Sequence, residues 1–262
     1  MKKYIADWTI KENIPFNDNE CYLLKLSLEE KIPIILPGQF VQVLVEDSST
    51  TFLRRPISVH FVDKEKNELW LLVQVIGNGT RKLSERKKGD RVNLIYPLGN
   101  GFSLPEDKSK ITGKLLLIGG GVGVAPLLYL GACLQELGYS PEFLLGAKIK
   151  KDVLQINEFG KFGKIYITTE DGSAGEKGFV TNHSILQSGG FDFIYTCGPK
   201  PMMAAVVRYA REKGIACEVS LENTMACGIG ACLCCVEKTV RGNVCVCTEG
   251  PVMNINQLTW QI

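Results

Sequence analysis

The stretch Lys114-Leu-Leu-Leu-Ile118-Gly119-Gly-Gly-Val-Gly123-Val-Ala-Pro126 decides how this chain of 262 residues folds. Its first five residues are predicted to form a buried β-strand, and Val124–Leu137 is predicted to form a helix that stops at Gly138. The glycines between them predict a tight turn whose amide hydrogens, with the helix N-terminus, suit a phosphate group. The spacing is Gly-x-Gly-x-x-Pro, so the third glycine of the common dinucleotide-binding pattern is missing.

The alternation of strand and helix continues to about residue 222. A second helix is predicted from near Pro201 to Lys213, where Gly214 ends it. Further buried strands are predicted at Phe143–Leu145, Lys164–Thr169, Phe191–Thr196 and Ala216–Ser220. This alternation predicts a parallel sheet covered on both faces. Ligands bind beyond the carboxyl ends of such strands, so two motifs are expected to face one another across one crevice. They are the glycines Gly119, Gly120, Gly121 and Gly123, and the sequence Cys197-Gly198-Pro199.

Residues 1 to about 105 have a different pattern, which is typical of an antiparallel barrel or sandwich. Short β-rich runs are separated by Pro, Gly, Asn and Asp. The predicted strands are Cys21–Leu28, Phe40–Val45, Ile57–Val62, Glu68–Ile76 and Val92–Tyr96. The polar stretch Pro105–Gly113 is the predicted linker to the α/β part.

Two motifs in the β part suit a cofactor with a diphosphate. In Arg54-Arg55-Pro56-Ile57-Ser58-Val59, the arginine fork can pair with two phosphate oxygens, and the serine can place a hydroxyl beside a ring nitrogen. Taken alone, an Arg-Pro strand start is usually structural. The second motif is Gln74-Val-Ile-Gly77-Asn-Gly79-Thr80, whose amides can hold phosphate at a helix start. Asn-Gly is also the strongest hairpin-turn dipeptide, so a plain turn is the alternative.

Six of the ten cysteines lie between Cys227 and Cys247. Four of them, Cys227, Cys232, Cys235 and Cys247, are separated by four, two and eleven residues, as in plant-type [2Fe–2S] proteins. Gly228 and Gly230 allow the backbone to curl around such a cluster and to donate N–H groups to its sulfurs. The remaining cysteines outside this region, apart from the one in the Cys-Gly-Pro motif, lie in apolar stretches and are expected to be buried thiols: Cys21, Cys133 and Cys217.

A structural zinc site is the alternative for the cysteine-rich segment. Zinc sites usually use two paired knuckles, and the second pair here would be Cys245-x-Cys247, a poor bite for tetrahedral zinc. Cys234 and Cys245 are left over in the iron–sulfur interpretation. If Cys245–Cys247 is a strand, both sulfurs share one face, so alternation does not choose between them.

Composition excludes several classes of protein. The chain is 45% hydrophobic and 22% charged with a formal charge of +2, typical of a soluble globular protein and not of a nucleic-acid-binding one. Leu115–Leu134 carries no charge over twenty residues, but its glycines and Pro126 predict a buried strand, turn and helix instead of a membrane span. The N-terminus has no stretch apolar enough for a signal peptide, and clustered cysteines fit a reducing compartment, so a cytoplasmic location is expected.

These motifs in this order resemble the ferredoxin reductase family, on Arg55-Pro56-x-Ser58, Gly121-x-Gly123-x-x-Pro126 and Cys197-Gly198-Pro199. The resemblance implies an FAD-binding antiparallel β-barrel (1–105), a parallel α/β NAD-binding domain (110–222) and a C-terminal [2Fe–2S] segment (223–262). With its cysteines, the chain is also similar to the electron-transfer subunits of NAD-dependent (class 1B) dihydroorotate dehydrogenases. The phrases Met225–Cys232 and Glu170–Gly178 strengthen that similarity.

The resemblance also implies roles for individual residues. Arg55 would bind the FAD diphosphate, with Pro56, Ile57 and Ser58 beside the flavin ring. Other implied FAD contacts are Leu72, Val73 and Gln74 along the ring, and Gly79 and Thr80 at phosphate. The binding site for the nicotinamide nucleotide would be formed by Gly119, Gly120, Gly121, Gly123, Cys197, Gly198 and Pro199. The cluster ligands would be Cys227, Cys232, Cys235 and Cys247. Many reductases place an aromatic residue over the flavin, and Trp260 is the candidate here.

The implied function is an electron relay in pyrimidine biosynthesis. An FMN-containing partner would oxidise dihydroorotate, and electrons would reach NAD⁺ through the [2Fe–2S] cluster and the FAD of this chain, in a heterotetramer of two of each subunit. No catalytic general base is required, and His60 and His183 are expected to be structural. The alternatives are a subunit of an NADPH:ferredoxin oxidoreductase or sulfide dehydrogenase, and an iron–sulfur redox sensor without turnover. The choice of NAD over NADP stays open, because Lys148, Lys150 and Lys151 lie near the predicted site.

Overall fold

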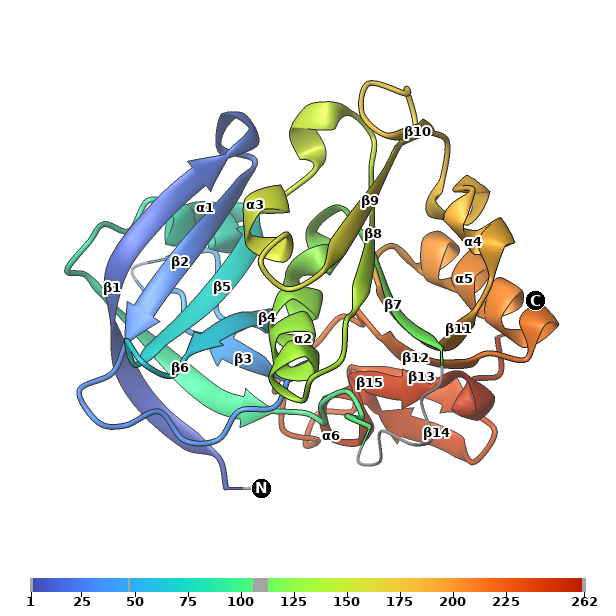
Figure 1. The fold of residues 1–262 in the computed structure, drawn as a ribbon. Coiled ribbons are helices and arrows are strands. Elements are labelled where there is room, and N and C mark those ends of the chain that lie inside the picture. The colour runs from blue at the N-terminus through green and yellow to red at the C-terminus, as the bar shows by residue number, and fades with distance from the viewer. Residues whose placement is uncertain (1, 47, 106–112, 261–262) are drawn as a thin grey trace.

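The structure is a computed structural model that describes residues 2–46, 48–105 and 113–260. Six antiparallel strands close into a barrel in the order β1-β2-β5-β4-β3-β6 (Figure 1). The strands are β1 (Tyr4–Phe16), β2 (Cys21–Ser27), β3 (Phe40–Val43), β4 (Arg55–Asp63), β5 (Glu68–Gln74) and β6 (Arg91–Leu98). The antiparallel β domain is therefore confirmed, and of the two shapes that the sequence left open it is the barrel. Closure removes the free edges that a sandwich would leave.

Strand β1 was not predicted from the sequence. It carries charged residues along much of its length, but Trp8 and Ile10 point inward and are fully buried. On β3, alternation divides the side chains between two cores. Val41 and Val43 fill the barrel interior, whereas Phe40 packs in the core shared with the rest of the chain. The face of β3 that carries Phe40 is therefore the face on which the other parts of the molecule pack.

The second half of the chain forms a seven-stranded sheet in the order β10-β9-β8-β7-β11-β12-β15. Its strands are β7 (Lys114–Gly120), β8 (Glu142–Ala147), β9 (Lys164–Thr169), β10 (Glu176–Lys177), β11 (Phe191–Cys197), β12 (Ala216–Ser220) and β15 (Val252–Asn254). All neighbours pair in parallel except β12 and β15. The predicted parallel α/β sheet is confirmed, with one antiparallel strand added at its edge.

Helices complete the two halves. A short 3₁₀ turn, η3 (Gly121–Val124), leads from β7 into α2 (Ala125–Glu136), which packs between the sheet and the barrel strand β4 (Figure 1). The other helices are α1 (Asn78–Ser84), α3 (Ile156–Phe159), α4 (Ile185–Ser188), α5 (Lys200–Lys213) and α6 (Val246–Glu249). The 3₁₀ turns used below are η1 (Asn17–Asn19) and η4 (Lys150–Asp152). No helix among the described residues is long and apolar enough to span a membrane. The proposed linker lies largely outside the described residues.

The C-terminal segment is joined to the α/β half. It contains the hairpin of β13 (Val236–Thr239) and β14 (Gly242–Cys245), followed by α6 and by β15, which pairs with β12. Cys235, Val246 and Met253 belong to the same buried core as Leu116 and Ile194 of the sheet. The segment folds over the end of the sheet because these apolar side chains have no core of their own to fill.

Candidate functional site

A cavity of about 610 Å³ lies on the outer face of the barrel, between β4, β5, the start of α1 and residues 221–225. We call it the barrel cavity. All nine residues expected to contact FAD line it: Arg55, Pro56, Ile57, Ser58, Leu72, Val73, Gln74, Gly79 and Thr80. They come from two neighbouring strands and the loop that follows β5, so one side of the cavity is built from residues close together in the fold.

Arg55 lies against the first turn of α1. A Cβ atom at Gly79 would lie 2.6 Å from Nε of Arg55, so the glycine is required for this approach. The loop before α1 is a helix start, because the Thr80 hydroxyl accepts hydrogen bonds from the backbone N–H groups of Ile76 (2.9 Å) and Gly77 (3.2 Å). The plain hairpin alternative is therefore wrong. A guanidinium beside backbone donors suits a diphosphate.

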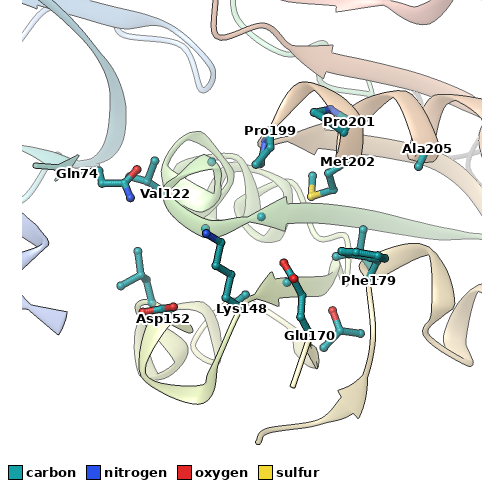
Figure 2. Close-up of a pocket in the computed structure, with 18 of the residues that line it drawn as sticks. Gln74, Val122, Lys148, Asp152, Glu170, Phe179, Pro199, Pro201, Met202 and Ala205 are labelled. Carbon is teal, nitrogen blue, oxygen red and sulfur yellow. The ribbon is translucent and has the colours of Figure 1, made fainter. Parts of the chain in front are cut away.

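A second cavity, of about 630 Å³, opens at the carboxyl ends of β7, β8 and β9, and we call it the sheet cavity (Figure 2). Of the residues expected around the nicotinamide nucleotide, four line it: Gly120, Gly121, Gly123 and Pro199. Gly119, Cys197 and Gly198 do not. Gly119 and Cys197 are paired across β7 and β11, and a Cβ atom at Gly123 would overlap the backbone of Gly198. The two glycine motifs thus touch directly, and close packing at this edge needs both glycines.

Charged side chains occupy one side of the sheet cavity. Lys148, Asp152 and Glu170 extend from the ends of β8, η4 and β9, opposite Pro199 and Met202 at the start of α5 (Figure 2). Of the three lysines considered for a 2′-phosphate, only Lys148 lines the cavity; Lys151 instead forms an ion pair with Asp18 at 3.0 Å. Two carboxylates accompany the one lysine on this wall. Carboxylates accept hydrogen bonds from ribose hydroxyls and repel a phosphate, so the wall suits the ribose of NAD better than the 2′-phosphate of NADP.

The barrel supplies part of the sheet cavity, which sequence reasoning missed. Asn17, Glu20 and Cys21, around the turn between β1 and β2, line it. The Asn17 amide donates a hydrogen bond to Oδ1 of Asp152 at 3.2 Å. The polar run Asn17–Asn19 signals a turn, and all three residues have positive φ. No sequence signal says which distant loop this turn contacts.

The two cavities share three lining residues: Gln74, Val122 and Glu222. Part of the Glu222 side chain faces the open space of the cavities. Protein atoms nevertheless lie around it on most sides, and this burial raises the pKa of its carboxyl group. The Cys197 thiol lies 3.8 Å from Oε1 of Glu222, and complete burial raises the pKa of Cys197 as well. The wall between the cavities therefore carries a carboxyl and, next to it, a thiol whose pKa values are both raised by burial. Glu222 was not identified from the sequence, because a lone glutamate after a strand carries no motif.

The four expected cluster ligands lie together, joined by backbone hydrogen bonds. Three amides of the loop, those of Ile229, Ala231 and Cys232, donate to Sγ of Cys227 at 3.3–3.5 Å. The amide of Gly230 donates to Sγ of Cys247 at 3.1 Å. The amide of Cys247 donates to Sγ of Cys235 at 3.4 Å. Sulfur atoms surrounded by N–H donors are suited to thiolates, which fits an iron–sulfur cluster.

The pKa values of these thiols differ with their surroundings. Hydrogen bonds from backbone amides, first that of Ile229, lower the pKa of Cys227 to about 6. Burial raises the pKa of Cys247 to about 12. Cys235 and Cys247 are buried, whereas Cys232 is exposed and Cys227 is half-buried. One side of the cysteine group therefore faces the core and the other faces solvent.

The two spare cysteines, Cys234 and Cys245, lie at different places in the segment. The Cys234 thiol is exposed and lies 3.8 Å from the carbonyl oxygen of Thr224. Cys245 ends β14, and Cys247 lies beyond it in α6, so the pair does not form one continuous strand. The hydrogen bond from the Gly230 amide favours Cys247, although the Cys245 thiol also lies near the thiols of Cys235, Cys227 and Cys232. Among the described residues, no three His, Cys, Asp or Glu side chains are grouped around a single metal-ion position.

The barrel cavity extends to the cysteine loop. Met225 lines the cavity and lies two residues before Cys227. Trp260 does not line it: its indole N–H donates to Glu237 at 3.1 Å, and its ring lies under Lys200 at the start of α5. The expectation that Trp260 covers the flavin is therefore wrong. His60 and His183 line neither cavity.

Both histidines have structural contacts. Nδ1 of His60 lies 2.8 Å from the carbonyl oxygen of Ala125, which joins β4 to the start of α2, and burial lowers the pKa of His60 to about 4. His183 accepts a hydrogen bond from the amide of Ile185 at 3.0 Å.

Comparisons with known proteins agree with this geometry. Residues 222–259 match the family described as the iron–sulfur cluster binding domain of dihydroorotate dehydrogenase B. The chain is 40% identical to the dihydroorotate dehydrogenase B (NAD(+)) electron transfer subunit of Shouchella clausii over 226 residues, which is 85% of this chain and 86% of the relative. It is 38% identical to the protein of that name from Fusobacterium nucleatum over 254 residues, covering 95% and 96% of the two chains.

Solved structures resemble the whole chain. A structure of the NADH-dependent reduced ferredoxin-NADP oxidoreductase superposes with a TM-score of 0.83 at 28% identity, covering 97% of this chain and 90% of that one. The ferredoxin reductase of carbazole 1,9a-dioxygenase shares the fold, with a TM-score of 0.67 at 20% identity over 82% of this chain and 67% of that one.

Proposed function

The chain belongs to the family of dihydroorotate dehydrogenase B electron transfer subunits, and from this premise we propose that it carries electrons from a dihydroorotate-oxidising partner to NAD⁺ in pyrimidine biosynthesis. One observation carries the proposal. The barrel cavity shares a wall with the sheet cavity on one side and reaches the cysteine loop through Met225 on the other. Three redox sites in contact, in this order, are what a relay requires.

The barrel cavity is the proposed FAD site. Arg55 and the amides at Gly79 and Thr80 would hold the diphosphate, and Ser58 and Leu72–Gln74 would lie along the flavin ring. FAD supplies the exchange between hydride and single-electron transfer that the other two sites cannot perform. The proposed division of the chain is 1–105 for this barrel, 110–222 for the NAD-binding α/β domain and 223–262 for the cluster segment.

The four cysteines Cys227, Cys232, Cys235 and Cys247 are the proposed ligands of a [2Fe–2S] cluster, which carries one electron at a time. Their amide hydrogen bonds support this assignment. The protein's own part is to hold the thiolates, to donate N–H groups to them, and to keep two of them away from water.

The sheet cavity is the proposed NAD site. Gly120, Gly121, Gly123 and Pro199 would form its floor, and Lys148, Asp152 and Glu170 would contact the nucleotide at the outer side. The shared wall then orients the nicotinamide towards the barrel cavity and excludes water between them. No side chain is needed to take a proton from the substrate, and the residues of the shared wall would act by position.

We also propose the partner and its docking side. The partner is the FMN-containing catalytic subunit, in a cytoplasmic heterotetramer of two of each chain. Ile229 and Leu233 on the cysteine loop are 46% and 65% exposed, and Leu233 is held at a φ of +58°. Exposed apolar side chains beside redox-active cysteines suit a covered interface. Changing Leu233 to Asp should therefore abolish copurification with the partner while leaving NADH oxidation by artificial acceptors intact.

The direct test is an anaerobic titration of the purified protein with NADH, followed by visible absorbance. Loss of both a flavin band and the broader iron–sulfur absorbance is expected. A coloured protein that NADPH bleaches and NADH does not would contradict the NAD assignment. A colourless protein with one zinc per chain would make the cysteine site structural, and iron-containing protein without any turnover would make it a sensor.

A second candidate is a subunit of an NADPH:ferredoxin oxidoreductase or sulfide dehydrogenase. The observation that favours it is the likeness of the whole chain, cysteine segment included, to the NADH-dependent reduced ferredoxin-NADP oxidoreductase structure. Mixing the reduced protein with the dihydroorotate-oxidising subunit and, separately, with ferredoxin distinguishes the two. Rapid electron exchange with ferredoxin alone would favour the second candidate.

A further inference from the structure

Gln42 is a fully buried polar residue between the barrel and the cysteine loop. It lies on β3, where Val41 and Val43 point into the barrel core and Phe40 packs in the core that contains Cys235 and Cys247. Because side chains alternate along a strand, Gln42 shares the outer face with Phe40. It is 0% exposed, although a free barrel surface would be the ordinary place for a glutamine.

The cysteine loop rests directly on the Gln42 amide. Nε2 of Gln42 lies 3.5 Å from the carbonyl oxygen of Ala226. A Cβ atom at Gly228 would lie 2.6 Å from the same nitrogen, and Gly228 has a φ of +70°. Ala226 and Gly228 are the two neighbours of Cys227, so the backbone on both sides of this thiol is in contact with one side chain.

The backbone of Gln42 contacts the strand that lines the barrel cavity. Gln42 faces Pro56 across β3 and β4, and its carbonyl oxygen accepts a hydrogen bond from Arg54 at 3.2 Å. Arg55 and Pro56 line the barrel cavity. Gln42 is thus one residue that joins the strand of the proposed flavin site to the loop of the proposed cluster site.

The Gln42 side chain is only partly satisfied. Its Oε1 atom has no hydrogen-bond partner among the described residues, and its one bond from Nε2 is long. A buried amide left in this state is destabilising, because its polar atoms have lost hydrogen bonds to water that the protein does not replace. An apolar side chain of the same length would avoid that cost, so packing alone does not account for a glutamine here.

We propose that Gln42 is a positioning residue for the iron–sulfur cluster, which holds the Cys227 loop at a fixed place on the barrel and presents an amide dipole to it. This inference rests on the proposed function, because it assumes that the four cysteines bind a cluster. The loop that Gln42 holds carries the amides of Ile229, Ala231 and Cys232, which donate to Sγ of Cys227, and N–H donors to cluster sulfurs raise the reduction potential. Removing the amide should therefore shift the cluster potential to a more negative value.

The test compares Gln42→Met with a matched control, Gln39→Met. Gln39 is also a buried glutamine next to β3, but its amide donates to Gly99 and accepts from Leu36, within the barrel part of the chain. Cluster potential and the electron paramagnetic resonance signal of the reduced protein are measured for both, with iron and FAD content. We expect a more negative potential and an altered signal for Gln42→Met only. Wild-type values for Gln42→Met would overturn the proposal.

A second measurement is needed if the Gln42→Met variant does not bind the cluster. Hydrogen exchange of the amides of residues 226–232 is measured in cluster-free protein, where Gln42→Met should exchange about tenfold faster than wild type and Gln39→Met should not. Equal exchange in all three proteins would overturn the positioning role. The proposed function fails separately, because it is contradicted if wild-type protein binds no iron or if NADH does not reduce it.

Discussion

The barrel cavity and the sheet cavity are similar in volume but are built in opposite ways. The nine residues expected to contact FAD come from Arg55–Ser58, Leu72–Gln74 and the Gly79-Thr80 pair, all within one barrel and its loop. The sheet cavity is lined by the β1–β2 turn of the barrel, three strand ends and the start of α5. The expected FAD contacts are therefore local, although Val122, Ala125 and residues 221–225 close the barrel cavity from the other half of the chain, whereas the sheet cavity has no such local part.

This difference teaches what each cavity should tolerate. A local site depends on a few strong groups, so loss of one group should remove binding without disturbing the rest of the molecule. A site assembled from many segments depends on their close approach, so it should be most sensitive where two backbones touch. The predictions below test that contrast and the wall where the cavities meet.

The largest effect is expected for Arg55→Met in the barrel cavity. Loss of the guanidinium removes two charge-assisted hydrogen bonds to a diphosphate, together about 3–4 kcal/mol, which corresponds to roughly 100-fold to 1,000-fold weaker FAD binding. The dissociation constant is measured by quenching of flavin fluorescence on the apoprotein. A change of less than about threefold would mean that the diphosphate is held elsewhere and that the cavity is less local than its residues indicate.

Arg54→Met is the matched control. Arg54 is adjacent and half-buried, but its guanidinium bonds to the carbonyl oxygens of Gln42 and Asn93 and to the Asn93 side chain, outside the cavity. We expect lower stability of this variant with FAD affinity within about threefold of wild type. Equal losses of FAD affinity in both variants would indicate a general effect of arginine removal on the barrel.

The next effect is expected for Gly123→Ala in the sheet cavity. The new Cβ would overlap the backbone of Gly198, so the two glycine motifs must move apart. Overpacking of this kind costs about 1–3 kcal/mol, and we expect the KM for NADH to rise roughly tenfold or more while FAD content stays at the wild-type level. Steady-state kinetics with an artificial acceptor check it. Loss of FAD with an unchanged KM would contradict the separation of the two sites.

The same contrast explains how much could be predicted from the sequence. Alternating and continuous apolar runs predicted five barrel strands and the five main parallel strands, because burial leaves a period in the sequence. Strand β1 was not predicted, since charged residues on its outer face obscure the alternation around Trp8 and Ile10. The pairing of β15 in the C-terminal segment with β12 was not predicted, because pairing at a sheet edge depends on where a chain arrives in space.

The site follows the same division. Motifs whose chemistry is local predicted nine of the residues that line the barrel cavity, but none of those that the α/β half and the C-terminal segment add to it. Glu222 and Gln42 carry no motif, and both matter only through what the fold brings beside them. Cys247 was preferred over Cys245 by family resemblance alone, and the contact that supports it is a hydrogen bond from Gly230, seventeen residues away.

His60 joins the barrel strand β4 to the start of α2, and its substitution tests how the two halves of the chain depend on each other. It lies on β4 and contacts the carbonyl oxygen of Ala125, the first residue of α2. Burial lowers the pKa of His60 from 6.5 to about 4, so the folded protein keeps it neutral while the unfolded chain binds a proton below pH 6.5. Its contribution to stability is therefore present above pH 6.5 and is lost as the pH falls towards 4.

We expect wild-type protein to lose about 2 kcal/mol of unfolding free energy between pH 7 and pH 5 through this group, and His60→Gln to lack that loss. Guanidinium unfolding at both pH values, followed by tryptophan fluorescence, measures the difference. Glutamine keeps a donor for the carbonyl oxygen of Ala125, so any constant cost of the substitution cancels between the two pH values. Equal pH dependence in both proteins would show that His60 does not titrate during unfolding.

The smallest effect is expected at Glu222, in the wall that both cavities share. Its carboxyl has a raised pKa, so it is protonated at lower pH and gains a negative charge as the pH rises through that value. A charge in this wall opposes the arrival of electrons from either side, because protein atoms screen it less than bulk water does. We expect the rate of NADH oxidation to fall a few-fold as the pH rises, and Glu222→Gln to show no such fall.

Glutamine resembles the protonated carboxyl, so the two proteins should have equal rates at low pH and differ only at high pH. If instead Glu222→Gln changes the KM for NADH at every pH, Glu222 belongs to the sheet cavity alone, and the wall does not couple the two sites.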